Sequence, residues 1–122
     1  MQKILVIDDD SLVRDTLVRI LERKGYQVLV ASDGLRGLRM FRSEQPDLVI
    51  TDIIMPEKEG LETIREIRGE CPDAKIIAIS GGARIGSMDF LDFAGKLGAS
   101  EIIPKPFDPI DLISVVSRCL GA

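Results

Sequence analysis

Five short apolar segments recur along the chain, at residues 4–7, 28–31, 48–51, 75–79 and 101–103. Isoleucine, leucine and valine dominate them, and the apolar side chains occupy consecutive positions rather than alternate ones. This pattern is typical of strands in a parallel sheet that helices cover on both faces. Each segment therefore predicts a buried strand.

Between these segments, apolar residues recur at the spacing of amphipathic helices, with charged residues on the other side. Gly25 is expected to end the first helix, and Asp108 followed by Pro109 to begin the last. Asp10 with Ser11 is expected to cap the first helix, because that helix begins there. The five expected apolar faces are Leu12, Thr16, Leu17, Ile20 and Leu21; Leu35, Leu38, Met40 and Phe41; Leu61, Ile64 and Ile67; Phe90, Leu91, Phe93, Ala94 and Leu97; and Leu112, Val115, Val116 and Leu120.

Strands and helices thus alternate five times in a chain of 122 residues, which is the length of one ordinary domain. With right-handed crossovers, this order predicts an α/β fold: a doubly wound, five-stranded parallel sheet with helices on both faces. We expect residues 1–122 to form this single domain, with no output domain in the sequence.

The composition is that of a globular protein, and the residue types that it lacks exclude several kinds of active site. Hydrophobic residues make up 45% of the chain and charged residues 30%. The sequence contains no histidine, which excludes Ser–His and Cys–His nucleophile pairs as well as histidine metal sites. Cys71 and Cys119 form no metal-binding or disulfide pattern, so we expect them to be free thiols.

Charge and hydropathy bear on partners and location. The net charge of -4 argues against binding to nucleic acid, which requires a surplus of Lys and Arg on one face. No apolar run reaches the roughly 18 residues of a membrane span, and no signal peptide precedes the first strand. We expect a cytoplasmic protein that contacts neither nucleic acid nor membrane directly.

Side chains suited to phosphoryl chemistry follow four of the five predicted strands. They are Asp8, Asp9 and Asp10, then Asp52, then Ser80, and finally Lys105. Because the carboxyl ends of parallel strands meet at one edge of a sheet, we expect these residues to converge there. Clustered carboxylates without histidine or cysteine suit Mg²⁺. A lysine and a serine suit a phosphoryl group, for which a carboxylate can itself be the nucleophile.

The type and order of these residues resemble the response-regulator receiver domains of two-component signalling, over the whole chain. The motifs are ILVIDDD at residues 4–10, PDLVITDIIMP at 46–56 with Gly60 beyond, Ile79-Ser80, Gly98-Ala99 and Lys105-Pro106-Phe107. The resemblance implies the (βα)5, flavodoxin-like fold of these domains. It also implies that Asp52 accepts a phosphoryl group from the phosphohistidine of a kinase.

The same resemblance implies a role for each residue around Asp52. Asp9 and Asp52 would bind Mg²⁺ directly, Asp8 would act mainly through water, and the backbone carbonyl of Ile54 would complete the protein ligands. Ser80 would close onto the phosphoryl oxygens after transfer. Lys105 would pair first with the acceptor carboxylate and then with the phosphoryl group, and a cis peptide to the following proline would aim it.

The partners that the resemblance implies are proteins. A sensor histidine kinase or a phosphotransfer protein would donate the phosphoryl group, and a downstream protein target or an output domain in trans would read it. A second copy of the chain, forming a homodimer, is a further candidate partner. The chain would be a phosphoacceptor rather than an enzyme acting on other molecules, since its chemistry would be limited to self-phosphorylation and autodephosphorylation.

Two alternative functions remain open. Residues 8–12 (DDDSL) also resemble the Asp-x-Asp start of small haloacid-dehalogenase-like phosphatases, although the chain is short for their cap and lacks their late acidic pair. A receiver-like interaction module without phosphorylation is the other alternative, and the intact acidic site argues against it. A phosphoryl group found on Asp52 would favour the receiver function, whereas one on Asp8 would favour the phosphatase.

Two departures from the family pattern concern the switch. Ile102 stands where most members carry Tyr or Phe, and residues 80–98 form a longer, glycine-rich stretch. We expect weak coupling through Ile102. The response to phosphorylation is expected to concentrate between residues 80 and 90.

Overall fold

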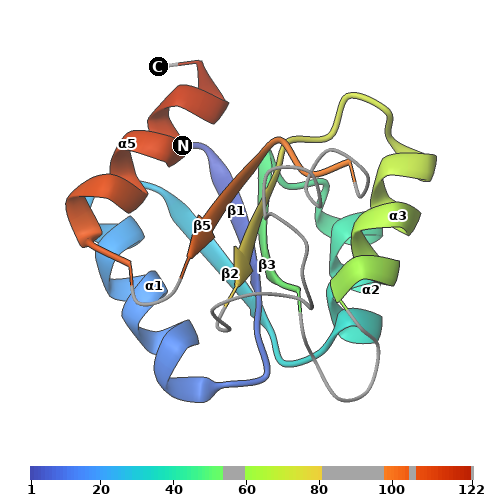
Figure 1. Cartoon of the computed structure of the whole chain (residues 1–122), viewed down its shortest axis with the longest axis horizontal. Coiled ribbons are helices and arrows are strands. Elements are labelled where there is room, and N and C mark those ends of the chain that lie inside the picture. Colours follow the sequence, from blue (N-terminus) through green and yellow to red (C-terminus); the bar gives the residue numbers. More distant parts are fainter. Residues whose placement is uncertain (54–59, 81–97, 105–106, 122) are drawn as a thin grey trace.

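The computed structural model describes residues 1–53, 60–80, 98–104 and 107–121. Within them, five strands form one sheet in which every neighbouring pair is parallel (Figure 1). In spatial order the strands are β2 (Gln27–Ala31), β1 (Lys3–Ile7), β3 (Leu48–Asp52), β4 (Ile76–Ser80) and β5 (Glu101–Pro104). The predicted strands are confirmed, and each differs from its predicted range by at most one residue at either end.

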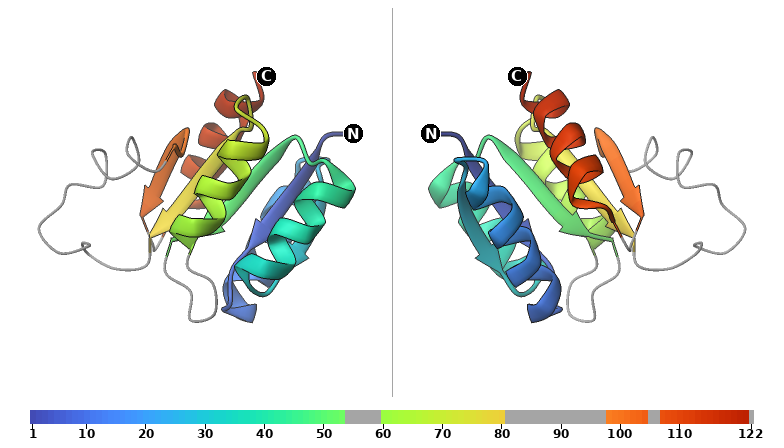
Figure 2. Two further views of the ribbon diagram at one scale, coloured as in Figure 1. Left: turned by 90° about the vertical axis from the view of Figure 1, so that its right-hand side faces the viewer. Right: turned by 90° about the vertical axis from the view of Figure 1, so that its left-hand side faces the viewer.

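Helices cover both faces of the sheet, as Figures 1 and 2 show. The described helices are α1 (Ser11–Arg23), α2 (Gly34–Glu44), α3 (Gly60–Glu70) and α5 (Pro109–Leu120). α1 and α5 lie on one face, and α2 and α3 lie on the other. The doubly wound α/β fold is therefore confirmed. The helix expected around residues 90–97 lies outside the described residues.

Successive strand residues point into two separate cores. In β1, Ile4 and Val6 pack with α1 and α5, whereas Leu5 and Ile7 pack with α2 and α3. All four side chains are fully buried. The consecutive apolar pattern of the sequence arises because the central strands contribute to both cores at once.

The outer strand β2 departs from the expectation of a strand covered on both faces. Val28 and Leu29 are only half-buried, and Val30 is 41% exposed. β2 has a single neighbouring strand, β1, because it lies at the edge of the sheet. Its apolar sequence therefore did not distinguish it from the central strands.

Two of the expected helix faces are shifted in their first turns. Leu12 in α1 and Leu35 in α2 were expected in the core, but they are 73% and 50% exposed. Val13 packs against the core in α1 instead, and Thr16 is exposed and donates a hydrogen bond to the carbonyl of Leu12 at 2.8 Å. The first turn of α1 therefore turns Val13 rather than Leu12 toward the core.

Local side-chain contacts fix the beginnings of three helices. The carboxylate of Asp10 accepts from the amide of Leu12 at 2.9 Å, and that of Asp108 accepts from the amide of Ile110 at 2.7 Å. Both predicted caps are confirmed. Asp33 caps α2 in the same way, although the sequence analysis did not identify it.

Polar contacts between elements lie mainly at the surface. The Arg42 guanidinium in α2 binds the Glu70 carboxylate in α3, with a shortest N–O distance of 2.6 Å. This hydrogen bond lowers the pKa of Glu70, so the pair persists to lower pH than an unpaired glutamate would allow. Cys71 and Cys119 are free thiols, as predicted, and partial burial raises the pKa of Cys119.

A close approach between α2 and β1 explains why residue 37 is glycine. A Cβ atom on Gly37 would lie 2.4 Å from Cδ1 and 2.7 Å from Cγ1 of the fully buried Ile7. Gly37→Ala should therefore destabilise the protein by about 1–3 kcal/mol through overpacking, although alanine is the better helix former. The free energy of unfolding in urea measures this effect.

Gly69 in α3 is the matched control for that substitution. Nothing lies within 4 Å of the position that its Cβ would occupy. Gly69→Ala should be neutral or stabilising, by up to about 1 kcal/mol, because only helix propensity changes. Equal effects of the two substitutions would show that the contact with Ile7 is not what requires glycine at position 37.

Candidate functional site

Three carboxylates meet at the carboxyl edge of the sheet. Asp8 directly follows β1, and Asp52 is the last residue of β3. β1 and β3 are neighbours with Ile7 opposite Thr51, which brings Asp8 beside Asp52 across 44 positions of sequence. One carboxylate oxygen from each of Asp8, Asp9 and Asp52 lies within 4.8 Å of the others.

Burial divides the three acids into a covered pair and an open one. Asp8 is 1% exposed and Asp52 is 7% exposed, whereas Asp9 is exposed to solvent. Carboxylates that are partly removed from water repel one another more strongly than they would in bulk solvent. A cation held among the three carboxylates would reduce this repulsion, and Asp9 is the member of the cluster that is open to solvent.

The main chain of Asp8 is anchored on both sides of its Cα atom. Its amide donates to the carbonyl of Ala31 in β2 at 3.1 Å, and its carbonyl accepts from Nη1 of Arg14 in α1 at 2.7 Å. Its carboxylate also accepts from the amide of Asp10 at 2.9 Å. These contacts fix the turn from β1 into α1, and therefore the positions of two of the three acids.

The donor set fits a hard divalent cation. It consists entirely of carboxylate oxygens, without the nitrogen or sulfur ligands that Zn²⁺ prefers. Mg²⁺ is commonly held by one or two protein carboxylates while it keeps several waters, which agrees with two buried acids and one open to solvent. The residues present therefore fit the magnesium ion that the sequence suggested.

The structure places some of the predicted site residues and leaves others undescribed. Asp8, Asp9 and Asp52 are brought together, and Ser80 ends β4 at the same edge of the sheet, beside β3. Ile54 and Lys105, together with the peptide from Lys105 to the next residue, lie outside the described residues.

Of the two departures from the family pattern, the structure describes Ile102 but little of the glycine-rich stretch. Ile102 lies in β5 opposite Ala78 and packs, partly buried, against the core beneath α2 and α3. Most of the glycine-rich stretch, residues 81–97, lies outside the described part of the chain.

Arg14 is a contributor to this site that the sequence analysis missed. It is one of the charged residues between the apolar positions of the first helix, and its sequence signal is that it stands four residues after the helix cap Asp10. That spacing places Arg14 one turn into the helix, near the strand end. Which group its guanidinium would bind could not be read from the spacing.

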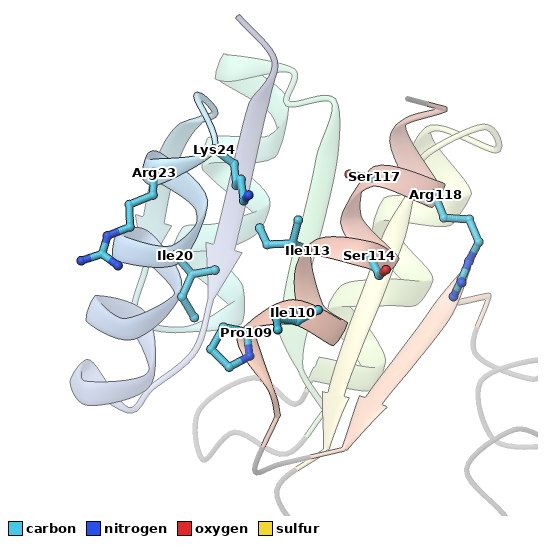
Figure 3. A pocket seen from close by; sticks show the side chains of 9 residues that line it. All are labelled: Ile20, Arg23, Lys24, Pro109, Ile110, Ile113, Ser114, Ser117 and Arg118. Atoms are coloured by element: carbon cyan, nitrogen blue, oxygen red, sulfur yellow. The ribbon is translucent and has the colours of Figure 1, made fainter.

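A wide hollow lies away from the three carboxylates, none of which lines it. It measures about 690 Å³ and is formed between α1 and α5. In Figure 3, Ile20 from α1 and Ile110 and Ile113 from α5 face the hollow, with Arg23 and Arg118 at its margins. None of the three carboxylates lines it, so the size of a hollow does not locate the chemistry of this protein.

Comparisons with known proteins agree with the geometry. A family model described as the response regulator receiver domain matches residues 4–117. Response regulator MprA of Mycobacterium tuberculosis is 36% identical over 116 residues, covering 92% of this chain and 47% of that protein. The DNA-binding transcriptional regulator NtrC of Azospirillum brasilense is 38% identical over 119 residues, covering 98% of this chain and 24% of that protein. This chain thus spans about half the length of MprA, and less of NtrC.

Solved structures give the same result over almost the entire chain. A response regulator receiver domain protein from Clostridium thermocellum has a TM-score of 0.89 and 36% identity, with 99% of this chain and 95% of that chain covered. The response regulator TrrA from Thermotoga maritima, solved in complex with Mg(2+)-BeF, has a TM-score of 0.87 and 37% identity, with 98% and 100% covered. These matches do not favour the phosphatase or the phosphorylation-independent module.

Proposed function

Because this chain belongs to the family of response regulator receiver domains, we propose that it accepts a phosphoryl group on Asp52. The observation that carries the proposal is the convergence of Asp8, Asp9 and Asp52 within 4.8 Å at the end of the sheet where α/β folds bind ligands. The donor is the phosphohistidine of a sensor histidine kinase or a phosphotransfer protein. This chain has no histidine, so it cannot itself be that donor.

The transfer is a displacement at phosphorus. A carboxylate oxygen of Asp52 forms a bond to the phosphorus atom, the bond from phosphorus to the donor nitrogen breaks, and the donor histidine leaves with the electron pair. The product is an acyl phosphate on Asp52. Water can later cleave it, so the chemistry of the chain comprises its own phosphorylation and autodephosphorylation.

Four residues of this chain would hold magnesium during transfer. Asp9, Asp52 and the backbone carbonyl of Ile54 are the proposed direct ligands, and Asp8 acts through water. When bound, Mg²⁺ neutralises negative charge on the phosphoryl oxygens and the acceptor. The all-oxygen cluster supports this assignment, as does the Mg(2+)-BeF complex of the similar TrrA.

Two residues outside the acidic cluster act on the phosphoryl group in this proposal. Lys105 pairs with the acceptor carboxylate and then with the phosphoryl group, and Ser80 donates a hydrogen bond to a phosphoryl oxygen. The position of Ser80 at the end of β4, next to the strand that ends in Asp52, supports its role. Lys105 rests on the family resemblance.

The phosphorylated chain would signal by changing its contacts with a protein. A downstream target, an output domain in trans or a second copy of the chain would recognise the new charge on Asp52. The net charge of -4 argues that these residues do not bind DNA themselves.

The direct test of this function uses a small donor, since it requires no knowledge of the kinase. The chain is incubated with an acyl phosphate and Mg²⁺, and its intact mass is measured. We expect the mass to increase by one phosphoryl group. When a chelator removes the metal before the donor is added, we expect no increase. A gain that is equally fast in the presence of chelator would contradict the proposed metal site.

Exposed apolar residues beside the acids support docking of a protein donor. Leu12 and Ile110, in the first turns of α1 and α5, are 73% and 77% exposed at the edge of the sheet that carries the site. Leu12→Ala should slow phosphoryl transfer from a phosphorylated kinase by several-fold, through lost apolar contact, while transfer from acyl phosphate stays unchanged. Rates measured with both donors check this, and equal slowing would place Leu12 in the chemical step instead.

Arg14 is expected to act as a positioning residue for the metal ligands. Arg14→Ala removes the 2.7 Å hydrogen bond to the carbonyl of Asp8 and should weaken Mg²⁺ binding about tenfold, as loss of outer contacts to metal ligands commonly does. Arg14→Lys keeps the charge without the planar fork and should restore only part of the affinity. Magnesium titration followed by amide NMR measures both. Tighter binding in Arg14→Ala would mean that charge repulsion outweighs positioning.

A further inference from the structure

A second cavity lies along the outer edge of β2, between α1 and α2, and measures about 450 Å³. Arg14, Arg36 and Arg39 line it together with Ser32, and Val30 and Met40 supply apolar side chains. Its volume falls within the range of small-molecule sites, and its lining combines a few polar groups with apolar surface as such sites do.

The positive charge of this cavity is only partly neutralised. Arg36 lies 3.7 Å from the Asp33 carboxylate and donates to the Ser32 hydroxyl at 3.1 Å. Arg14 uses one nitrogen on the carbonyl of Asp8, which is a neutral group. Arg39 has no ion-pair partner among the described residues. Three guanidinium groups therefore share one paired carboxylate.

The surrounding elements also favour an anion. Residues 11–44 contain seven Lys and Arg against four Asp and Glu, a net charge of +3 in a chain whose total is -4. The amino end of α2 begins just beyond Ser32, and the helix dipole adds partial positive charge there, part of which the capping carboxylate of Asp33 offsets. Guanidinium groups bind phosphate through two parallel hydrogen bonds, which makes arginine well suited to phosphate recognition.

We propose that this cavity binds a small phosphorylated molecule, with the phosphate on Arg36 and Arg39 and the organic part against Val30 and Met40. The volume of the cavity is sufficient for a free metabolite or nucleotide. The site is distinct from the acidic cluster, and it adjoins that cluster because Arg14 and Ala31 both hydrogen-bond to the main chain of Asp8.

The test uses AMP as the probe, with adenosine as its uncharged counterpart and pyrophosphate as a polyanion without an apolar part. Binding to the full chain is measured by calorimetry and by amide NMR, without magnesium or a phosphodonor, so the result is independent of phosphorylation at Asp52. We expect saturable AMP binding that shifts the amides of residues 30–40. Adenosine should bind at least about tenfold more weakly, since the charge-assisted contacts are lost.

The variants Arg36→Gln and Arg39→Gln should each weaken AMP binding about tenfold. Arg19→Gln is the matched control, because Arg19 is an exposed arginine of α1 that does not line the cavity. Its affinity should stay within about twofold of the unsubstituted chain. Absence of saturable AMP binding, or equal losses in all three variants, would overturn the proposal. Pyrophosphate binding as tight as AMP would overturn the role of Val30 and Met40.

Discussion

Asp52→Ala should abolish phosphorylation of this chain by both acyl phosphate and a kinase. The substitution removes the carboxylate oxygen that would form the bond to phosphorus, and the proposal gives the neighbouring Asp8 and Asp9 the role of holding the metal instead. The expected result is no gain in intact mass under conditions in which the unsubstituted chain gains one phosphoryl group. The effect is the loss of the reaction rather than a reduced rate.

Asp8 provides the control for this prediction, because the phosphatase alternative would place the phosphoryl group there. Asp8→Asn removes one charge from the cluster but leaves Asp52 in place, so it should slow phosphorylation without moving it. Peptide mapping after borohydride trapping locates the modified aspartate. Phosphate found on Asp8, or a persistent mass gain in Asp52→Ala, would refute the assignment of Asp52.

Asp9→Ala should weaken magnesium binding far more than Asp10→Ala does. Asp9 is the solvent-facing member of the three-carboxylate cluster and a proposed direct ligand. The carboxylate of Asp10 is instead engaged in capping α1, where it accepts from the amide of Leu12. Loss of a contact outside the direct ligands commonly reduces metal affinity about tenfold or more. Loss of a direct ligand should therefore reduce magnesium affinity by at least about tenfold.

The adjacent substitution Asp10→Ala tests whether the two acids are separable. It should leave magnesium affinity nearly unchanged and should cost about 1 kcal/mol of unfolding free energy, because the helix loses its cap. Magnesium titration and urea unfolding of both variants give the comparison. Equal losses of affinity would show that Asp10 belongs to the metal site.

Elements governed by local interactions were predictable from the sequence. The caps Asp10 and Asp108 bind amides two residues ahead, so the residue type and its place before an apolar helix predict the contact. The strands were predictable because five apolar segments alternate with helical patterns, and this order leaves few sheet topologies. The residue types at the ends of these strands also predicted that carboxylates would gather there.

The helix faces show where local pattern was insufficient. Leu12 and Val13 are both apolar neighbours at the start of α1, and the sequence analysis assigned Leu12 to the core. The structure packs Val13, partly buried, against the core and leaves Leu12 exposed. Adjacent positions on a helix differ by about 100° in direction, so the angle at which α1 lies on the sheet decides between them.

The sequence by itself determined the strands, the helix caps Asp10 and Asp108, the family and the three acids of the candidate site. Only the tertiary structure decided that Arg14 holds the carbonyl of Asp8 and that it shares a cavity with Arg36 and Arg39. An arginine on a polar helix face has the same sequence pattern whether it points into water or toward a neighbouring strand. Its partner is fixed by the packing of α1 and α2 around the edge of β2, which depends on contacts between residues that are distant in the chain.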